Sequence, residues 1–153
     1  MFTHGTLSSL RTQGRHRVRG DNVRFPRRAL THAFRRFSAY LAKSRDFRDA
    51  CARHLEFGAK HPRDYELLYG RGWMERVTAD AQSAEMERFT AHLVRAGVDE
   101  SKAAQAAYPI MMMLHGVVMH RLLNKKPSPR GRAIAAACLE ACMTLLESAR
   151  QGR

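Results

Sequence analysis

The chain has few cysteines and no apolar leader. Its 153 residues include three cysteines, Cys51, Cys138 and Cys142, an odd number without a CxxC spacing. Such a set does not build the disulfide framework of a small secreted domain and is typical of a reducing compartment. The N-terminal residues also lack the apolar core of a secretory signal, so we expect a cytoplasmic protein. An Arg-rich, acid-poor N-terminus is also the composition of an organellar transit peptide, which stays an alternative.

A long apolar run is missing as well. The most apolar stretch, from Ala103 to Met119, contains Gln105, Pro109 and His115. A membrane-spanning helix needs about 20 predominantly apolar residues. We therefore expect no membrane-spanning segment and no membrane partner.

The motifs of metal sites and of common enzymes are absent too. His115 and His120 are five residues apart, whereas two zinc ligands on one helix are spaced by four. Cys138 and Cys142 do have that spacing, and we expect both to pack as small apolar side chains. The chain contains no GxSxG elbow, no phosphate-binding loop, no GxGxxG and no carboxylate pair in apolar surroundings. We therefore expect no enzyme activity, no cofactor and no metal.

Acidic residues are scarce at one end of the chain. The sequence has 27 basic and 14 acidic residues, a net charge of +13, yet residues 1–45 contain a single acid, Asp21. Residues 1–28 show no helical period of apolar residues, and their like charges repel one another. We expect a disordered basic arm at 1–28 that binds polyanions, nucleic acid included, without reading a base sequence.

What the chain does contain is helical periodicity. Apolar residues recur at spacings of three and four, which predicts helices at about 27–43, 45–60, 62–70, 73–96, 99–123 and 131–150. Ser44 and Asp99 are the expected N-caps of the second and fifth helices, and Gly97 is expected to end the fourth. No alternating strand pattern occurs. The predicted fold class is all-α, a bundle of about six helices with the last two long helices antiparallel across a polar turn at 124–132.

The stretch PIMMMLHGVVMH, from Pro109 to His120, is apolar nearly all round. A helix of this kind is central in a fold or lies at an interface. Methionines fill irregular gaps, His115 offers one polar group, and Gly116 lets a helix or a ligand come close. Two interpretations stay open. One is a ligand cavity between helices. The other, which these residues alone favour, is a core with a hydrogen-bonded histidine.

The last helix carries small residues in AIAAACLEAC, which permit close packing. A pair of long helices at the end of a chain can dock on its own copy with two-fold symmetry. The expected dimer interface consists of Leu122, Ile134, Ala137, Ala141 and Leu145.

Two motifs resemble the C-terminal regulatory domain of TetR-type transcriptional regulators. One is HPRDYELLY at 61–69, and the other is the His115-Gly116 pair in AAYPIMMMLHGVVMHRLLN, where Met111 stands in place of the family's tryptophan. The resemblance covers about residues 37–150. It implies an all-helical domain with a pocket for a small hydrophobic effector between its central helices, and a homodimer through the last two long helices. It favours the cavity interpretation of His115. The pocket candidates, chosen by their position along the helices, are Tyr69, Trp73, Phe89, Met112 and His115.

The chain departs from the family at its N-terminus. TetR-type regulators begin with a helix-turn-helix unit of about fifty residues, and nothing in residues 1–36 resembles one. Three explanations are open: a truncated or frame-shifted gene, a stand-alone sensor that forms a heterodimer with a full-length relative, and a stand-alone domain whose basic arm binds nucleic acid nonspecifically.

The sequence thus predicts a basic arm at 1–28 and a TetR-like regulatory domain at 29–150 that binds an effector and dimerises. DNA binding by the chain itself does not follow from these residues. The alternative function is a small helical binding protein with no transcriptional role and a nonspecific nucleic-acid-binding arm.

Overall fold

The computed structural model describes residues 27–70, 79–124 and 128–152. The described residues form α-helices and no strand, which confirms the all-α prediction. The helices are α1 (Arg27–Leu41), α2 (Phe47–Lys60), α3 (Pro62–Tyr69), α5 (Ala79–Arg95), α6 (Glu100–Asn124) and α7 (Pro129–Arg150). The predicted arm at 1–28 lies almost wholly outside these residues, as does the pocket candidate Trp73.

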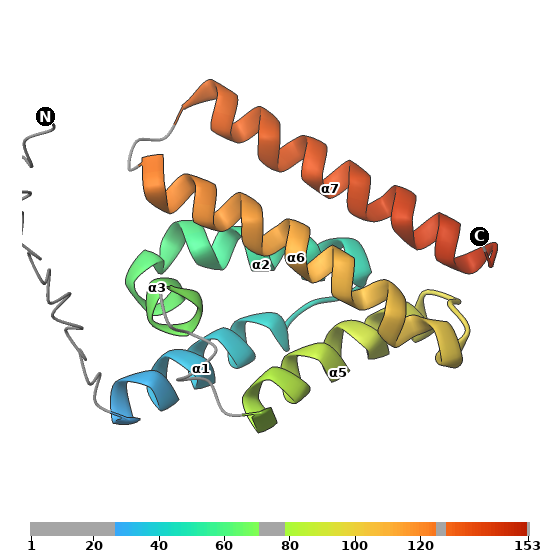
Figure 1. Ribbon diagram of the computed structural model, residues 1–153, viewed down its shortest axis with the longest axis horizontal. Coiled ribbons are helices and arrows are strands. Elements are labelled where there is room, and N and C mark those ends of the chain that lie inside the picture. Colours follow the sequence, from blue (N-terminus) through green and yellow to red (C-terminus); the bar gives the residue numbers. More distant parts are fainter. Residues whose placement is uncertain (1–26, 71–78, 125–127, 153) are drawn as a thin grey trace, which may run out of the picture.

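Helix α6 is the central helix of the bundle. It contacts α5 and α2 on its inner side and α7 on its outer side, while α1 packs against α3 and α2. In Figure 1, α7 lies along α6 and runs in the opposite direction. The antiparallel arrangement predicted for the last two helices is therefore present. None of the described helices is long and apolar enough to cross a bilayer.

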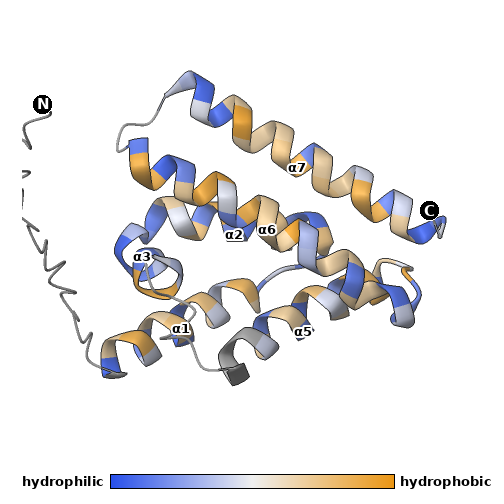
Figure 2. Cartoon of the chain, in the orientation of Figure 1, coloured by the Kyte–Doolittle hydropathy of each residue, from blue (hydrophilic) through white to orange (hydrophobic). Residues whose placement is uncertain are grey.

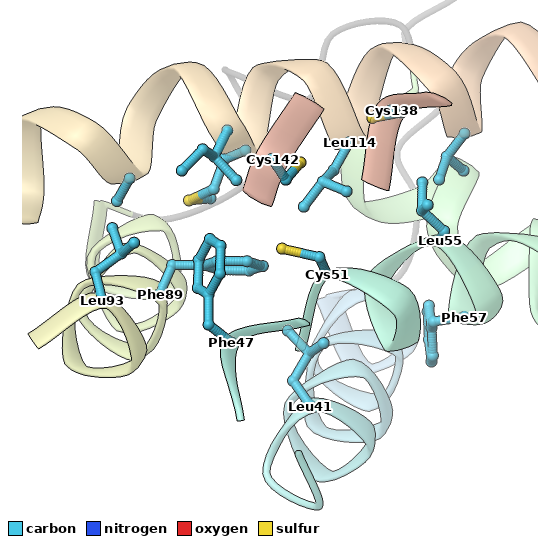
Figure 3. Packing of buried hydrophobic residues seen from close by; sticks show 14 of the residues in the cluster. Leu41, Phe47, Cys51, Leu55, Phe57, Phe89, Leu93, Leu114, Cys138 and Cys142 are labelled. Atoms are coloured by element: carbon cyan, nitrogen blue, oxygen red, sulfur yellow. The ribbon is translucent and has the colours of Figure 1, made fainter. Parts of the chain in front are cut away.

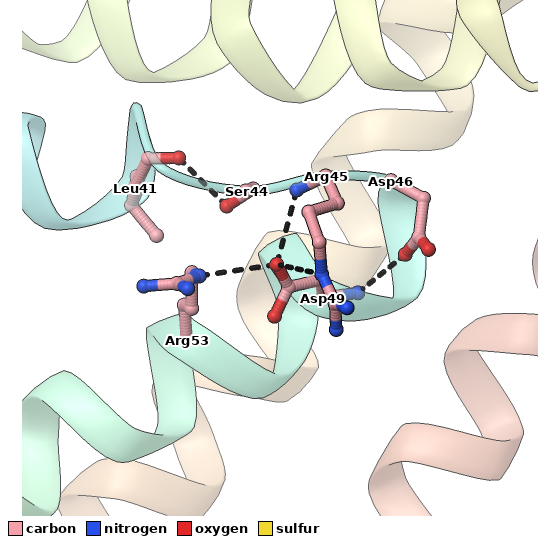
Figure 4. Close-up of polar contacts among 6 residues, drawn as sticks. All are labelled: Leu41, Ser44, Arg45, Asp46, Asp49 and Arg53. Atoms are coloured by element: carbon pink, nitrogen blue, oxygen red, sulfur yellow. Dashed lines mark hydrogen bonds and ion pairs between the residues drawn. The ribbon is translucent and has the colours of Figure 1, made fainter.

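The junction between α1 and α2 is fixed by side-chain capping. Asp46 is the N-cap of α2, and its Oδ1 accepts a hydrogen bond from the backbone N–H of Asp49 at 2.8 Å. The Asp49 carboxylate accepts in turn from the backbone N–H of Arg45 at 3.0 Å, and from Arg53 (Figure 4). The prediction that Ser44 caps α2 is wrong. Its hydroxyl donates to the carbonyl of Leu41 at 2.6 Å and closes α1 instead, and Asp46, two residues later, caps α2.

The other helix ends follow local sequence signals. Pro62 occupies the first turn of α3, where its missing N–H costs nothing. Gly97, with φ of +92°, adopts the left-handed conformation that ends α5. Asp99 Oδ1 accepts from the backbone N–H of Ser101 at 2.9 Å, as predicted for the cap of α6. Ser128 caps α7, so this helix begins two residues earlier than predicted.

The core fills the space where α1, α2, α5, α6 and α7 meet. Its largest fully buried side chains include Phe37, Phe57, Phe89, Leu93 and Leu114. Figure 3 shows the three cysteines within this packed set. All three are buried free thiols, and they pack as small apolar residues. The neighbouring Cys142 sulfur and burial both raise the pKa of the Cys51 thiol, so that thiol stays protonated.

Helices α2 and α6 cross at a glycine. A Cβ built on Gly58 would lie 2.9 Å from Val118 Cγ2, 3.1 Å from Val118 Cβ and closer still to Val118 Cγ1. Real Cβ atoms do not come so near to branched carbon atoms. The absence of a side chain at Gly58 therefore sets how closely the two helices approach.

Helix α6 is buried along one side only. Ile110, Leu114 and Val118 have no more than 1% of their surface exposed, whereas Tyr108 is 59% and Met112 39% exposed. Figure 2 shows apolar residues along both α6 and α7. Within one copy of the chain, α6 is therefore central on one side and open on the other, and its place at an interface stays a prediction. The exposed side of α6 is available to a ligand or to another molecule.

Candidate functional site

A cavity of about 90 Å³ lies between α2, α3, α5 and α6. Its lining consists of His54, Tyr69, Glu85, Met86, Tyr108, Met111, Met112 and His115. Glu85 and His54 are 4% and 1% exposed and form the floor, whereas the exposed Tyr108 and Met112 form the rim. The volume equals that of about three molecules of liquid water. The cavity thus has a polar floor, thioether walls and a rim of two exposed side chains.

A chain of hydrogen bonds runs beside the cavity. The Tyr65 hydroxyl lies 2.8 Å from His54 Nε2 and 3.1 Å from His115 Nδ1. A hydroxyl carries one proton, so it donates to one imidazole and accepts from the other. The ring of Tyr65 is stacked on that of His115, with centroids 5.8 Å apart. The position of one proton on Tyr65 therefore fixes the tautomers of both histidines together.

Glu85 is the acidic group of the cavity. Its Oε2 accepts a hydrogen bond from the Tyr69 hydroxyl. Its Oε1 faces His54 Nδ1 at 3.6 Å. Neither of these two atoms has a hydrogen-bond partner among the described residues. Leaving a buried polar group without a partner costs about 1–3 kcal/mol. Two such atoms therefore meet at the cavity floor, close enough for one bound group to serve both.

Burial changes the pKa values of the polar cluster formed by His54, Tyr65, Tyr69, Glu85 and His115. Loss of solvent raises the pKa of Glu85 to about 7. Loss of solvent, with a smaller contribution from His115, lowers the pKa of His54 to about 3. Burial also raises the pKa of the Tyr65 and Tyr69 hydroxyls well above the usual value and lowers that of His115. At neutral pH both imidazoles and both phenols are uncharged, and Glu85 is the group that titrates.

The helices place these polar side chains on buried faces by ordinary periodicity. On α5, Glu85 lies one turn before Phe89 and two turns before Leu93, both buried. On α2, His54 lies on the face that also buries Cys51 and Gly58. Each polar residue thus occupies a position where helical spacing calls for an apolar one.

Three predicted pocket residues, Tyr69, Met112 and His115, come together in the lining of this cavity. Phe89 is not among the lining side chains. It lies in the core, its ring centroid 6.0 Å from that of His54, and supports the floor from behind. Trp73 lies outside the described residues.

Three members of the cluster, His54, Tyr65 and Glu85, were not among the sequence candidates. The sequence did contain an indication of these residues, because each is a polar residue at a helix position whose neighbours on the same face are apolar. An acid or an imidazole on a buried helix face needs a partner in the core. Both interpretations of His115 stay open, because it is hydrogen-bonded to Tyr65 and also lines the cavity.

An open apolar groove of about 440 Å³ runs between α6 and α7 on the opposite side of α6. Its lining consists of Met113, Gly116, Val117, His120, Ile134, Ala137, Cys138 and Ala141. Ile134, Ala137 and Ala141 were predicted as dimer-interface residues. The other two predicted, Leu122 and Leu145, are half-buried against the core. A Cβ at Gly116 would meet no atom within 4 Å, so the groove is open at that point.

Among the described residues, no group of three or more His, Cys, Asp or Glu side chains is arranged to hold a metal ion. Comparison of the chain with models of known families, with curated proteins and with solved structures gives no match.

Proposed function

We propose that the chain is a ligand-sensing and dimerising domain of the TetR regulator type, which binds a small effector and has no catalytic role. The observation that carries the proposal is the cavity between α2, α3, α5 and α6. An apolar wall with a few convergent polar groups of perturbed pKa is the usual composition of a small-molecule site. In this cavity the wall is formed by Met86, Met111 and Met112, and the polar groups are Glu85 and His54.

A second copy of the chain is the proposed occupant of the groove between α6 and α7. The groove is lined almost entirely by apolar side chains, and two long antiparallel helices that meet their own copy form a two-fold symmetric interface. The sequence resemblance to TetR-type domains supports the same pair of helices. A heterodimer with a full-length relative would use the same surface.

Helix α6 links the two proposed surfaces. Met112 and His115 line the cavity, while Met113 and Gly116, their immediate neighbours, line the groove. An effector that shifts α6 therefore changes the surface that a second copy contacts. This is the requirement for coupling between an effector site and a dimer interface. In a regulator, such coupling alters the spacing of attached DNA-binding units.

Methionine methyl NMR tests the ligand site directly. Of the eight methionines in the chain, Met86, Met111 and Met112 line the cavity, whereas Met143 lies on α7. In a screen of small apolar and amphipathic compounds, a ligand of the cavity should shift the methyl signals of the first three and leave Met143 unchanged. A screen in which no compound shifts these three signals would contradict the proposed binding role.

Light scattering tests the dimer. The chain has a mass of 17.4 kDa, and we expect twice that mass in solution. Ala137→Glu should lower the mass toward that of the monomer, because it places a charge in an apolar interface. Ala136→Glu is the matched control, since Ala136 is exposed on α7 and does not line the groove. A monomeric wild-type chain would favour the alternative of a stand-alone helical binding protein.

A further inference from the structure

The floor of the cavity carries a carboxylate that no described residue supplies with a counter-charge. Within the described residues the Glu85 carboxylate has one hydrogen bond, from Tyr69, and no ion pair with Lys or Arg. Arg88 lies near enough to lower the pKa of Glu85 slightly but does not bond to it. A buried carboxylate is normally paired with a cation or a donor. The Oε1 atom, without a partner and lining the cavity, is the position where such a partner is missing.

In one of the two tautomers open to it, His54 adds a second acceptor at the same place. If the Tyr65 hydroxyl donates to His115 Nδ1, His54 Nε2 donates to Tyr65, and His54 Nδ1 then carries a lone pair. That lone pair faces Glu85 Oε1 across 3.6 Å. In that tautomer, two acceptors at this separation repel each other when nothing lies between them. A single group with two N–H bonds satisfies both atoms.

We infer that the cavity selects a small organic cation, a protonated amine or amidine whose N–H groups bond to Glu85 Oε1, and to His54 Nδ1 where that nitrogen carries the lone pair, and whose apolar part lies at the rim. This inference rests on the proposed ligand-sensing function and adds the chemical class of the ligand. A volume of about 90 Å³ accommodates the charged group with a few carbon atoms. The rest of the ligand lies between Tyr108 and Met112, which are already exposed.

The walls of the cavity also suit a cation. Tyr69 contributes its aromatic ring to the wall, and the face of a tyrosine ring attracts positive charge. An anion would meet the negative charge of Glu85 in a site with little water to screen it. A neutral alcohol could donate one hydrogen bond to Glu85 but would leave its charge uncompensated.

Three probes of similar shape distinguish a cationic, a neutral and an anionic ligand. Benzylamine, benzyl alcohol and benzoate share a ring and differ in the charge of the attached group. Affinities would be measured by methionine methyl NMR at about pH 8, above the pKa of about 7 that burial gives Glu85. A charge-assisted hydrogen bond exceeds a neutral one by enough for roughly a tenfold change in affinity. We expect benzylamine to bind at least about tenfold more tightly than benzyl alcohol, and benzoate to bind most weakly.

Two variants test whether the preference for benzylamine depends on the carboxylate of Glu85. Glu85→Gln keeps the size of the side chain and removes its charge, and we expect benzylamine to lose its advantage over benzyl alcohol. Glu87→Gln is the matched control on the same helix, because Glu87 is exposed and does not line the cavity. It should leave the order of the three probes unchanged.

The outcomes separate the inference from the proposed function. Binding of benzyl alcohol or benzoate at the cavity methyls, as tightly as benzylamine or more so, would overturn the cationic class and leave the ligand site in place. A preference for benzylamine that survives in Glu85→Gln would also overturn the inference. If none of the three probes moves these methyl signals, the inference fails. If no compound of the wider screen shifts these methyl signals either, the proposed ligand-sensing function is also contradicted.

Discussion

The crossing of α2 and α6 at Gly58 gives the sharpest prediction about stability. Replacing an interior helical glycine by alanine ordinarily stabilises a protein by up to about 1 kcal/mol. At Gly58 the new methyl group would overlap both methyl groups of Val118 and lie 3.1 Å from its Cβ. Val118 is 1% exposed. Rotation of its branched side chain moves the two methyl groups but leaves the Cβ in place, so it cannot relieve the contact with that atom. Overpacking of this kind costs roughly 1–3 kcal/mol, so we expect Gly58→Ala to lower the free energy of unfolding by about 1–2 kcal/mol.

A double-mutant cycle in urea checks the cause. Val118→Ala alone should be destabilising, because it removes buried carbon atoms. In that background the methyl group of Gly58→Ala enters the vacated space, and the substitution should become stabilising. The two effects should therefore differ in sign, with a coupling energy of about 2 kcal/mol, within the range of residues in contact. An equal effect of Gly58→Ala in both backgrounds would refute the reasoning, because it would show that α2 and α6 do not meet at these two residues.

Three further predictions concern single sites. Burial raises the pKa of Glu85 from its ordinary 4.5 to about 7, so the stability that the protonated carboxyl contributes is present below about pH 4.5 and is lost as the pH rises through about 7. Relative to wild type, Glu85→Gln should therefore gain roughly 3 kcal/mol in free energy of unfolding across that pH window, and a difference that is constant with pH in urea titrations would contradict this. Tyr65→Phe leaves nitrogen atoms of His54 and His115 without their partner and should cost about 1–3 kcal/mol. Tyr108→Phe, at an exposed ring, is the control, and equal losses in thermal unfolding would argue against the buried hydrogen-bond chain. Gly116→Ala meets no atom within 4 Å and should raise the free energy of unfolding of the monomer by up to about 1 kcal/mol, so a loss would mean that another group already fills this position.

Much of the fold was predictable because it is encoded locally. The periodicity of apolar residues gave the helices, and single residues such as Gly97 and Asp99 ended or capped them as expected. The cap of α2 was misplaced by two residues, at Ser44 instead of Asp46. A hydroxyl and a carboxylate are both good caps, and the choice between them depends on how α1 and α2 pack.

The candidate site was predictable only in part, because it is formed between helices. Tyr69, Met112 and His115 were found by their positions along helices, and all three line the cavity. The contact between His54 and Glu85 could not be read from either helix alone, since it joins α2 to α5. The apolar surface of α6 had a similar ambiguity. Hydrophobicity shows that a surface avoids water, but it does not distinguish a core from a groove left for another molecule.

The three buried thiols provide a way to follow the opening of the molecule. Cys51 on α2 and Cys142 on α7 are both fully buried, so a thiol reagent reaches them only after α7 lifts away from α2. When opening and closing are fast, the rate of modification gives the free energy of that local event apart from global unfolding. Cys138 lines the groove and is 8% exposed in a single copy of the chain, so it should react first in the monomer. Equal rates of labelling at Cys51 and Cys142 would then show that both thiols are exposed by one event, the separation of α7 from α2.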